Sequence, residues 1–276
     1  DTFGGSTIYS ATRENPGVFA GWRVADGAFD SELSARYDHN STFGNAFSGS
    51  AAAGWKLTDD LRLSASYGSA FRAPTLNELY SPGYGGDYAG NPLLDPERSR
   101  SGEMALSWRI DDVDQLEARA FSTRVHDLID FSGGSTFQAI NIDNAAIDGF
   151  ELIHTRRIAA WTWTNTLTLQ DPRNTDTGAQ LLRRPKQKFN SVFETPIGER
   201  AHAGIEFVAS GRSADVNDVT LGGYSLVNLR ADYALSRAWK IGARLENLFD
   251  RNYELAHGYN TPGLSGYLTV SYSPQP

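Results

Sequence analysis

The stretch Trp239-Lys240-Ile241-Gly242-Ala243-Arg244-Leu245-Glu246 decides the fold, because apolar and polar residues alternate along it one by one. In an extended chain every second side chain points to the same face. One face of this segment therefore carries Trp, Ile, Ala and Leu, and the other carries Lys, Gly, Arg and Glu. The pattern predicts a β-strand with one apolar face and one charged face.

The same alternation recurs along the chain, for example at 29–37, 203–207 and 227–233. We count about 14 such segments of roughly 9–13 residues, and no convincing helical period. Strands of globular proteins average about five or six residues, whereas a strand tilted across a bilayer needs about 9–11. The segments therefore predict an all-β fold of unusually long antiparallel strands.

The connections between these segments alternate in length. Short turns are expected near 25–27, 58–60, 111–114, 156–159, 195–199 and 236–237, and longer links at roughly 38–48, 73–98, 126–146, 170–185, 211–223 and 249–263. Tight turns at one end and long loops at the other are typical of outer-membrane barrels. We therefore predict a transmembrane antiparallel up-and-down β-barrel, with a large soluble β-sandwich as the alternative.

The composition is compatible with that prediction. The 276 residues include 33 acidic and 25 basic residues, no cysteine, and a formal net charge of −8. Disulfides and thiolate sites are excluded, and the charge argues against a nucleic-acid partner. No apolar run approaches the roughly 18 residues of a membrane-spanning helix. A mean hydropathy of −0.41 suits a soluble protein, but also a barrel whose charged lumen offsets its apolar outer face.

Residues that could carry catalysis do not form a recognisable group. The pairs Asp59-Asp60 and Asp111-Asp112 lie in expected turns, where solvation explains them better than acid–base chemistry. The five histidines lack metal-ligand spacing, and no nucleophile or phosphate-binding motif is present. We expect no enzyme activity, no metal site and no cofactor.

Four segments resemble motifs of TonB-dependent outer-membrane receptors, in that family's order. They are the stretches 67–80, Asn91-Pro92-Leu93-Leu94-Asp95-Pro96-Glu97-Arg98-Ser99, 144–151, and Glu246-Asn247-Leu248-Phe249-Asp250-Arg251-Asn252-Tyr253. The segments 40–44, 181–186 and 253–259 are similar to the cobalamin (vitamin B12) receptors within the family.

The resemblance implies a place and a role. Family members combine an N-terminal plug with a 22-strand barrel, so residues 1–276 would form the C-terminal portion of the barrel, without the plug, the TonB-contacting segment or the first strands. The chain starts at Asp1 without a leader, which suits a mature product or a fragment. The implied location is the bacterial outer membrane, and the implied partners are cobalamin or a ferric siderophore, TonB through the plug region, and outer-membrane lipid. A ferric-siderophore receptor and a passive pore are the alternatives.

Large aromatic and cationic side chains in the long links are the candidate ligand contacts, since they bury area and fix orientation together. They are Tyr84, Tyr88, Phe137, Arg183, Arg212, Tyr259 and Asn260. Alternatively, Arg183 and Arg184 pair with wall acids such as Glu206 or Asp232, and the tyrosines serve packing. The terminal strand should stop pairing near Ser273, because Pro274 cannot donate to a ladder.

Overall fold

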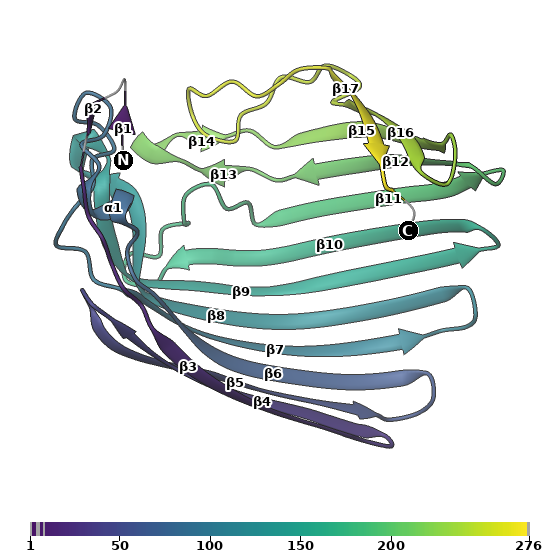
Figure 1. The fold of residues 1–276 in the computed structure, drawn as a ribbon, viewed down its shortest axis with the longest axis horizontal. Coiled ribbons are helices and arrows are strands. Elements are labelled where there is room, and N and C mark those ends of the chain that lie inside the picture. The colour runs from purple at the N-terminus through teal and green to yellow at the C-terminus, as the bar shows by residue number, and fades with distance from the viewer. Residues whose placement is uncertain (1, 4–5, 8, 275–276) are drawn as a thin grey trace.

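The computed structural model describes residues 2–3, 6–7 and 9–274, and its main feature is one antiparallel sheet of 13 strands (Figure 1). The strands are β3 (Gly17–Asp26), β4 (Phe29–Asn40), β5 (Gly44–Lys56), β6 (Leu61–Arg72), β7 (Glu97–Arg109), β8 (Asp114–Gly133), β9 (Gln138–Ile158), β10 (Trp161–Asn174), β11 (Gln187–Ile197), β12 (Ala201–Ser210), β15 (Tyr224–Ala234), β16 (Trp239–Glu246) and β17 (Ser265–Tyr272). Each pairs with its neighbours in chain order. The up-and-down topology is confirmed, with 13 strands against the expected number of about 14.

The remaining elements are short. They are the pair β1 (Thr2–Phe3) and β2 (Ser6–Thr7), the pair β13 (Ser213–Ala214) and β14 (Thr220–Leu221), the five-residue helix α1 (Leu76–Tyr80), and 3-10 turns at Gly134–Thr136 and Val216–Asp218. A capping box begins α1: the Thr75 hydroxyl accepts from the Glu78 N–H at 3.1 Å, and Glu78 accepts from the Thr75 N–H at 2.7 Å. In the described part of the chain, no helix is long and apolar enough to cross a membrane.

Short turns and long loops lie at opposite ends of the sheet, as predicted. The turns are 27–28, 57–60, 110–113, 159–160, 198–200 and 235–238, and the long loops are 73–96, 175–186, 211–223 and 247–264. Two expected long links are wrong. The link at 38–48 is a turn of three residues, because Asn40 Oδ1 accepts the N–H groups of Thr42 and Phe43, both at 3.0 Å. The link at 126–146 is largely paired, as β8 and β9 continue as a hairpin to Gly133 and Gln138.

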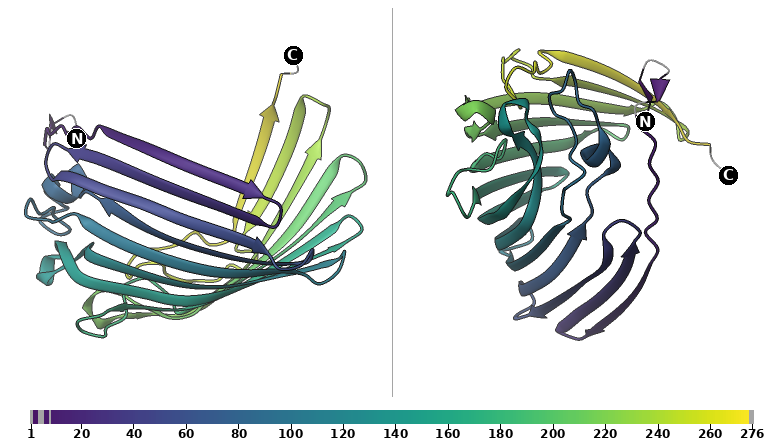
Figure 2. Two further views of the ribbon diagram at one scale, coloured as in Figure 1. Left: turned by 90° about the horizontal axis from the view of Figure 1, so that it is seen from below. Right: turned by 90° about the vertical axis from the view of Figure 1, so that its left-hand side faces the viewer.

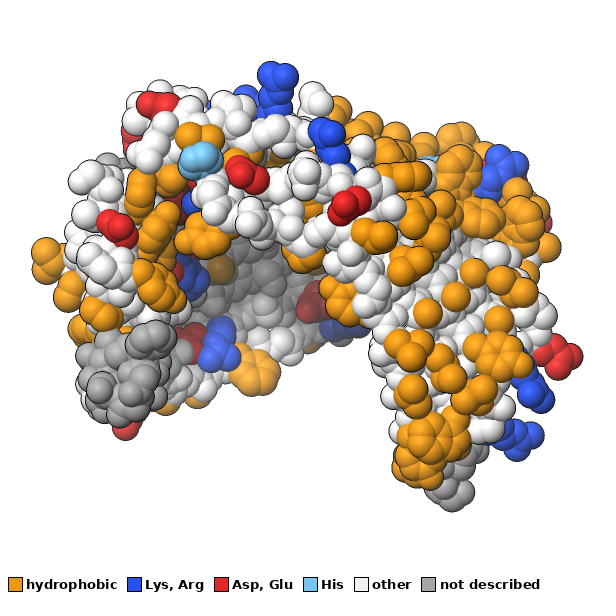
Figure 3. All heavy atoms as spheres, turned by 90° about the horizontal axis from the view of Figure 1, so that it is seen from above, with side chains coloured by type: hydrophobic (Ala, Val, Ile, Leu, Met, Phe, Trp, Pro, Cys, Tyr) orange, Lys and Arg blue, Asp and Glu red, His pale blue; other side chains and the backbone are white. Residues whose placement is uncertain are grey.

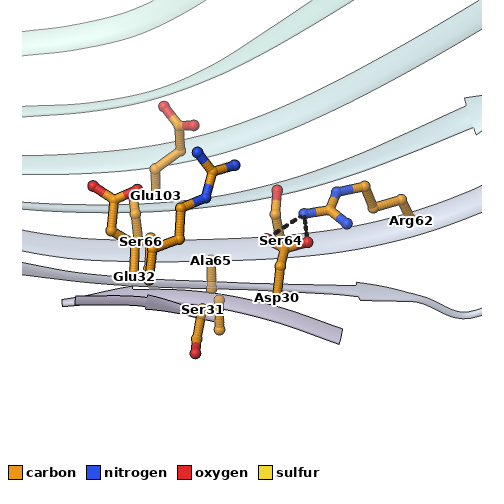
Figure 4. Close-up of a pocket in the computed structure, with 11 residues that line it drawn as sticks. Asp30, Ser31, Glu32, Arg62, Ser64, Ala65, Ser66 and Glu103 are labelled. Carbon is orange, nitrogen blue, oxygen red and sulfur yellow. Dashed lines mark hydrogen bonds and ion pairs between the residues drawn. The ribbon is translucent and has the colours of Figure 1, made fainter. Parts of the chain in front are cut away.

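The sheet curves into a trough (Figure 2). Figure 4 shows Asp30, Arg62 and Glu103 projecting to the concave side, whereas Ser31 projects away. Figure 3 shows hydrophobic side chains over the outer surface toward the C-terminal strands. The polar residues of the predicted alternation therefore face the lumen, and the apolar residues form the lipid-facing surface.

Large aromatics gather on the outer face at the short-turn end of the strands. They are Trp55, Trp108, Trp161, Tyr233, Trp239 and Tyr272, with exposed fractions between 46% and 57%. The rings of Trp239 and Tyr272 lie 4.7 Å apart between centroids. This is the arrangement expected of an interfacial girdle.

Among the described residues, one cluster of buried apolar side chains joins the loop 73–96 to the β8–β9 hairpin. Leu79, Leu94, Ile129 and Ala139 form this small core, against which Phe43 and Phe131 pack. Gly90 makes the contact possible, since a Cβ there would lie 2.8 Å from the carbonyl carbon of Leu79. The first long loop is thus attached to the β8–β9 hairpin rather than free.

The two edges of the sheet, β3 and β17, do not pair with each other in the described structure. The lumen is consequently open along one side (Figure 2). At the other edge, β17 ends at Tyr272, and the last ladder bond runs from the Ser273 N–H to the Ala238 carbonyl at 2.9 Å. The expected end of pairing near Ser273 is confirmed.

Candidate binding site at the long-loop end

The lumen face carries a polar lining with open hollows. A hollow of about 210 Å³ lies among Arg23, Glu32 and Glu103, beside the ion pair of Arg62 with Asp30 at 2.6 Å (Figure 4). A second, of about 450 Å³, is lined by Glu194, Glu206, Asn228, Arg230, Arg244 and Glu246. These hollows form a hydrated wall of mixed charge, and the geometry relevant to a large ligand lies in the loops above it.

Asp215 joins three of the four long loops. Its Oδ1 accepts from Arg183 Nε at 2.9 Å and from the Val216 N–H at 2.8 Å, and its Oδ2 accepts from the His257 N–H at 2.6 Å. The side chain is fully buried. Loops 175–186, 211–223 and 247–264 therefore meet at one carboxylate.

The electrostatics of this junction favour the charged form of Asp215. Burial by itself would raise its pKa, but the N–H groups of His257 and Val216 and the Arg183 guanidinium together hold the pKa below its ordinary value. The buried carboxylate is thus ionised at neutral pH, and the three groups that contact it are all hydrogen-bond donors.

Arg183 has an unusual backbone that suits this role. Its φ of 58° lies in the left-handed region, and its N–H donates to the Ala214 carbonyl at 2.7 Å. The neighbouring Leu181 is buried and donates to the Pro172 carbonyl at 3.0 Å. Arg183 thus lies in the loop before β11, and both its backbone and its side chain are hydrogen-bonded to loop 211–223.

The barrel-wall partners considered for the arginines are wrong. Glu206 accepts from Asn190 and Asn228, and Asp232 pairs with Lys240 at 3.2 Å. Arg184 donates to the Leu182 carbonyl at 3.2 Å. Asp215, which lies 32 positions further along the chain in another loop, is the ion-pair partner of Arg183 in place of these wall acids.

A small cavity of about 150 Å³ opens beside this junction. Arg183, Lys188, Tyr224 and Glu254 are among its lining residues, so groups of both charges meet there. The ring of Tyr224 lies 4.5 Å from that of Tyr253, between centroids. The cavity offers hydrogen bonds and aromatic surface, but it is too small to enclose a large ligand.

The other predicted contacts divide into two groups. Arg212, Tyr259 and Asn260 are exposed on the loops that Asp215 joins, and Tyr259 is 62% exposed. Tyr84 is 84% exposed on loop 73–96. Tyr88, in contrast, is half-buried and stacks on Phe137 at 5.2 Å between centroids. The structure therefore brings Arg183, Arg212, Tyr259 and Asn260 to one loop group, and gives Tyr88 and Phe137 a packing contact.

Residues of the motifs at 67–80, 91–99 and 246–253 hold the loops in place through contacts with one another. Arg72 contacts Glu97 at 2.6 Å and Glu78 at 3.0 Å, which joins the motifs at 67–80 and 91–99. In the last motif, buried Asn247 donates to the Arg251 carbonyl at 2.9 Å and accepts the Arg251 N–H at 2.8 Å. These contacts fix where the loops begin.

Asp215 was missed by sequence reasoning. Its only local signal is an acidic residue before the apolar Val216 and Val219, a common turn start. Its partners Arg183 and His257 are 32 and 42 positions away, so nothing in the neighbouring sequence marks the junction. No group of three or more potential metal ligands occurs among the residues that the structure describes.

Comparison with known proteins connects this architecture to one family. The family model described as "TonB dependent receptor-like, beta-barrel" matches residues 1–248. The vitamin B12 transporter BtuB of Vibrio vulnificus (strain YJ016) is 31% identical over 286 residues, which cover 97% of this chain and 44% of the relative. The chain therefore spans less than half the length of this relative.

Solved structures share the fold at lower identity. The copper transporter OprC superposes with a TM-score of 0.75 and 22% identity, over 94% of this chain and 47% of that chain. The ferric enterobactin receptor PfeA of Pseudomonas aeruginosa gives 0.74 and 21%, over 94% and 45%. The siderophore receptor PirA of Acinetobacter baumannii gives 0.74 and 20%, over 94% and 46%.

Proposed function

Because the chain belongs to the TonB-dependent receptor β-barrel family of the outer membrane, we propose that it forms lumen wall and outer loops of a receptor that imports cobalamin. The similarity to a vitamin B12 transporter over 97% of the chain carries this choice of ligand. In this proposal residues 1–276 supply the C-terminal portion of a 22-strand barrel.

The proposed mechanism is transport without covalent chemistry. The ligand docks on the long loops, and TonB then acts on a plug belonging to another part of the receptor, which opens a path along the charged lumen. Arg183, Arg212, Tyr259 and Asn260 contact the ligand from the loop group joined by Asp215, while Tyr84 and Tyr88 approach it from loop 73–96. Support for this comes from the exposure of Tyr84 and Tyr259 and from the shared junction of the other loops.

A ferric siderophore is the second candidate for the same loops. The two cations Arg183 and Arg212 suit an anionic ferric complex, and Tyr259 suits its aromatic groups. A passive pore is the third candidate, and liposome swelling by small solutes without TonB would favour it over a receptor.

Binding by the full receptor chain tests the choice of ligand. We expect cyanocobalamin to bind in equilibrium dialysis, and Tyr259→Ala to weaken binding by about tenfold, as for an exposed aromatic contact. The control Tyr67→Ala removes an aromatic from the outer face of β6 and should leave binding unchanged. Binding of a ferric siderophore in place of cobalamin would overturn the ligand and keep the family.

A further inference from the structure

The lumen wall carries one acid whose contacts differ from those of its neighbours. Three glutamates line the hollow of about 450 Å³. Glu194 pairs with Arg230, and Glu246 pairs with Arg244 at 2.9 Å. Glu206 has no ion pair among the described residues, and both of its carboxylate oxygens accept from side-chain amides instead. An amide has its donor on one end and its acceptor on the other, so these contacts are directional.

Glu206 fixes the side chain of Asn228, which stands directly opposite it on β15. Glu206 Oε2 accepts from Asn228 Nδ2 at 2.9 Å, and Glu206 Oε1 accepts from Asn190 Nδ2 at 2.8 Å. At its other end, Asn228 Oδ1 accepts the N–H of Asn247 at 2.9 Å. A carboxylate can only accept and a backbone N–H can only donate, so these two partners allow a single orientation of the Asn228 amide.

Asn247 is the residue at which the last long loop leaves β16. The ladder between β15 and β16 ends with Leu229 opposite Leu245, so the Asn247 N–H finds its acceptor in the side chain of Asn228. Asn247 is buried, and its φ of 51° lies in the left-handed region. Because a buried N–H without an acceptor is costly, the start of the loop depends on this bond.

The loop that begins at Asn247 carries two of the predicted ligand contacts, Tyr259 and Asn260. The hydrogen bonds from Glu206 through Asn228 therefore connect the lumen wall to the first residue of this loop.

We propose that Glu206 is a positioning residue for loop 247–264. It orients the Asn228 amide, which holds the start of the loop and thereby the position of Tyr259. Glu206 acts through Asn228 rather than through a contact with the ligand. The role of Tyr259 as a ligand contact rests on the proposed function, whereas the effect of Glu206 on the loop does not.

Hydrogen exchange in three variants of the full receptor chain tests the proposal. In Glu206→Leu the acceptor is lost, and we expect faster exchange across 247–264. In Glu206→Gln, the new Oε1 accepts from Asn228 and the new Nε2 donates to Asn190 once the Asn190 amide turns over, so exchange should match the unmodified protein. The control Glu103→Leu replaces a lumen acid of β7 that has no hydrogen bond or ion pair in the described structure, and exchange across the loop should be unchanged.

Ligand binding gives a second measurement. We expect Glu206→Leu to bind cyanocobalamin about tenfold more weakly in equilibrium dialysis, because a lost hydrogen bond displaces the loop. Glu206→Gln and Glu103→Leu should bind it as the unmodified protein does. If the unmodified protein does not bind cyanocobalamin, the proposed ligand is wrong, and the exchange measurement alone decides the role of Glu206.

A double variant tests whether the two residues act in series. Asn228→Leu breaks the same chain of hydrogen bonds, so exchange in E206L/N228L should be no faster than in Asn228→Leu alone. Additive effects would overturn the proposal, as would unchanged exchange across 247–264 in Glu206→Leu. Equal disturbance by Glu206→Gln and Glu206→Leu would overturn it as well, because the negative charge rather than the hydrogen bonds would then be responsible.

Discussion

At the scale of single residues, the loops depend on Asp215 more than on any predicted contact. Its carboxylate is fully buried and has donors from Arg183, Val216 and His257. A buried donor left without an acceptor costs about 1–3 kcal/mol. One side chain can therefore decide whether three loops stay together.

Replacement of Asp215 tests this. In Asp215→Ala, we expect loops 211–223 and 247–264 to become sensitive to protease while the strand content is kept, since the ladder bonds do not involve Asp215. Limited proteolysis with circular dichroism measures both. The exposed acid Glu199, in a short turn at the other end, gives the control Glu199→Ala, which should match the unmodified protein. Equal protease resistance of both variants would contradict the role of Asp215.

The pH dependence of loop docking follows from the same group. Because the folded-state pKa of Asp215 is lowered, its contribution to stability is present above the ordinary value of 3.8 and is lost as pH falls through the lowered pKa. We expect the loops to stay docked at pH 5 and to release only below that ordinary value. Pepsin cleavage across this range measures the release. Asp215→Asn should lack the acid transition, and a transition near neutral pH would contradict the assignment.

At the scale of elements, the loop 73–96 behaves as part of the sheet rather than as a flexible connection. Its helix α1 begins with a capping box, and Leu79 and Leu94 pack on Ile129 and Ala139 of the β8–β9 hairpin. The stacked rings of Tyr88 and Phe137 extend this contact. The loop is thereby held over the lumen.

Gly90 provides a sharp test of that packing. In Gly90→Ala the new Cβ would lie 2.8–2.9 Å from backbone atoms of residues 77–79, so the loop must shift. We expect faster hydrogen exchange across 76–96 with no change in β15 to β17. In Gly102→Ala the nearest atom is 3.5 Å away in the Tyr67 side chain, and exchange should be unaffected. Unchanged exchange in Gly90→Ala would show that the loop is not docked.

At the scale of the whole molecule, the distribution of apolar surface determines the environment. Large hydrophobic residues on the outer strands are widely exposed, among them Phe47 at 71%, Met104 at 57% and Leu268 at 76%. A soluble monomer rarely exposes contiguous apolar surface of this kind. The sheet requires lipid or detergent on its convex face.

This requirement gives a direct measurement. We expect the chain to stay monodisperse only in detergent, and to aggregate when detergent falls below its micelle concentration, because the apolar band then faces water. Size-exclusion chromatography with light scattering measures the change. A stable monomer in detergent-free buffer would contradict a transmembrane barrel.

The sequence by itself determined the architecture, because the alternation of apolar and polar residues can be recognised from residues that are adjacent in the chain. The alternation in segment 239–246 predicts which face of the strand contacts lipid and which faces the lumen. The positions of Gly, Asp and Ser between such segments predict the tight turns. The four motifs likewise identified the family. All these signals are local along the chain, so they survive without any knowledge of the fold.

Only the tertiary structure decided which distant residues meet. The contacts of Asp215 with Arg183 and His257 join three separate loops. In the sheet, the strand register places Arg100 opposite Arg124, and Arg173 two strands further on. Alternation predicts the face of the sheet on which a side chain lies. It does not predict the position of that side chain along the barrel axis, or the residue opposite it on the next strand. Those depend on the register of every hairpin, which the turns and loop contacts set together.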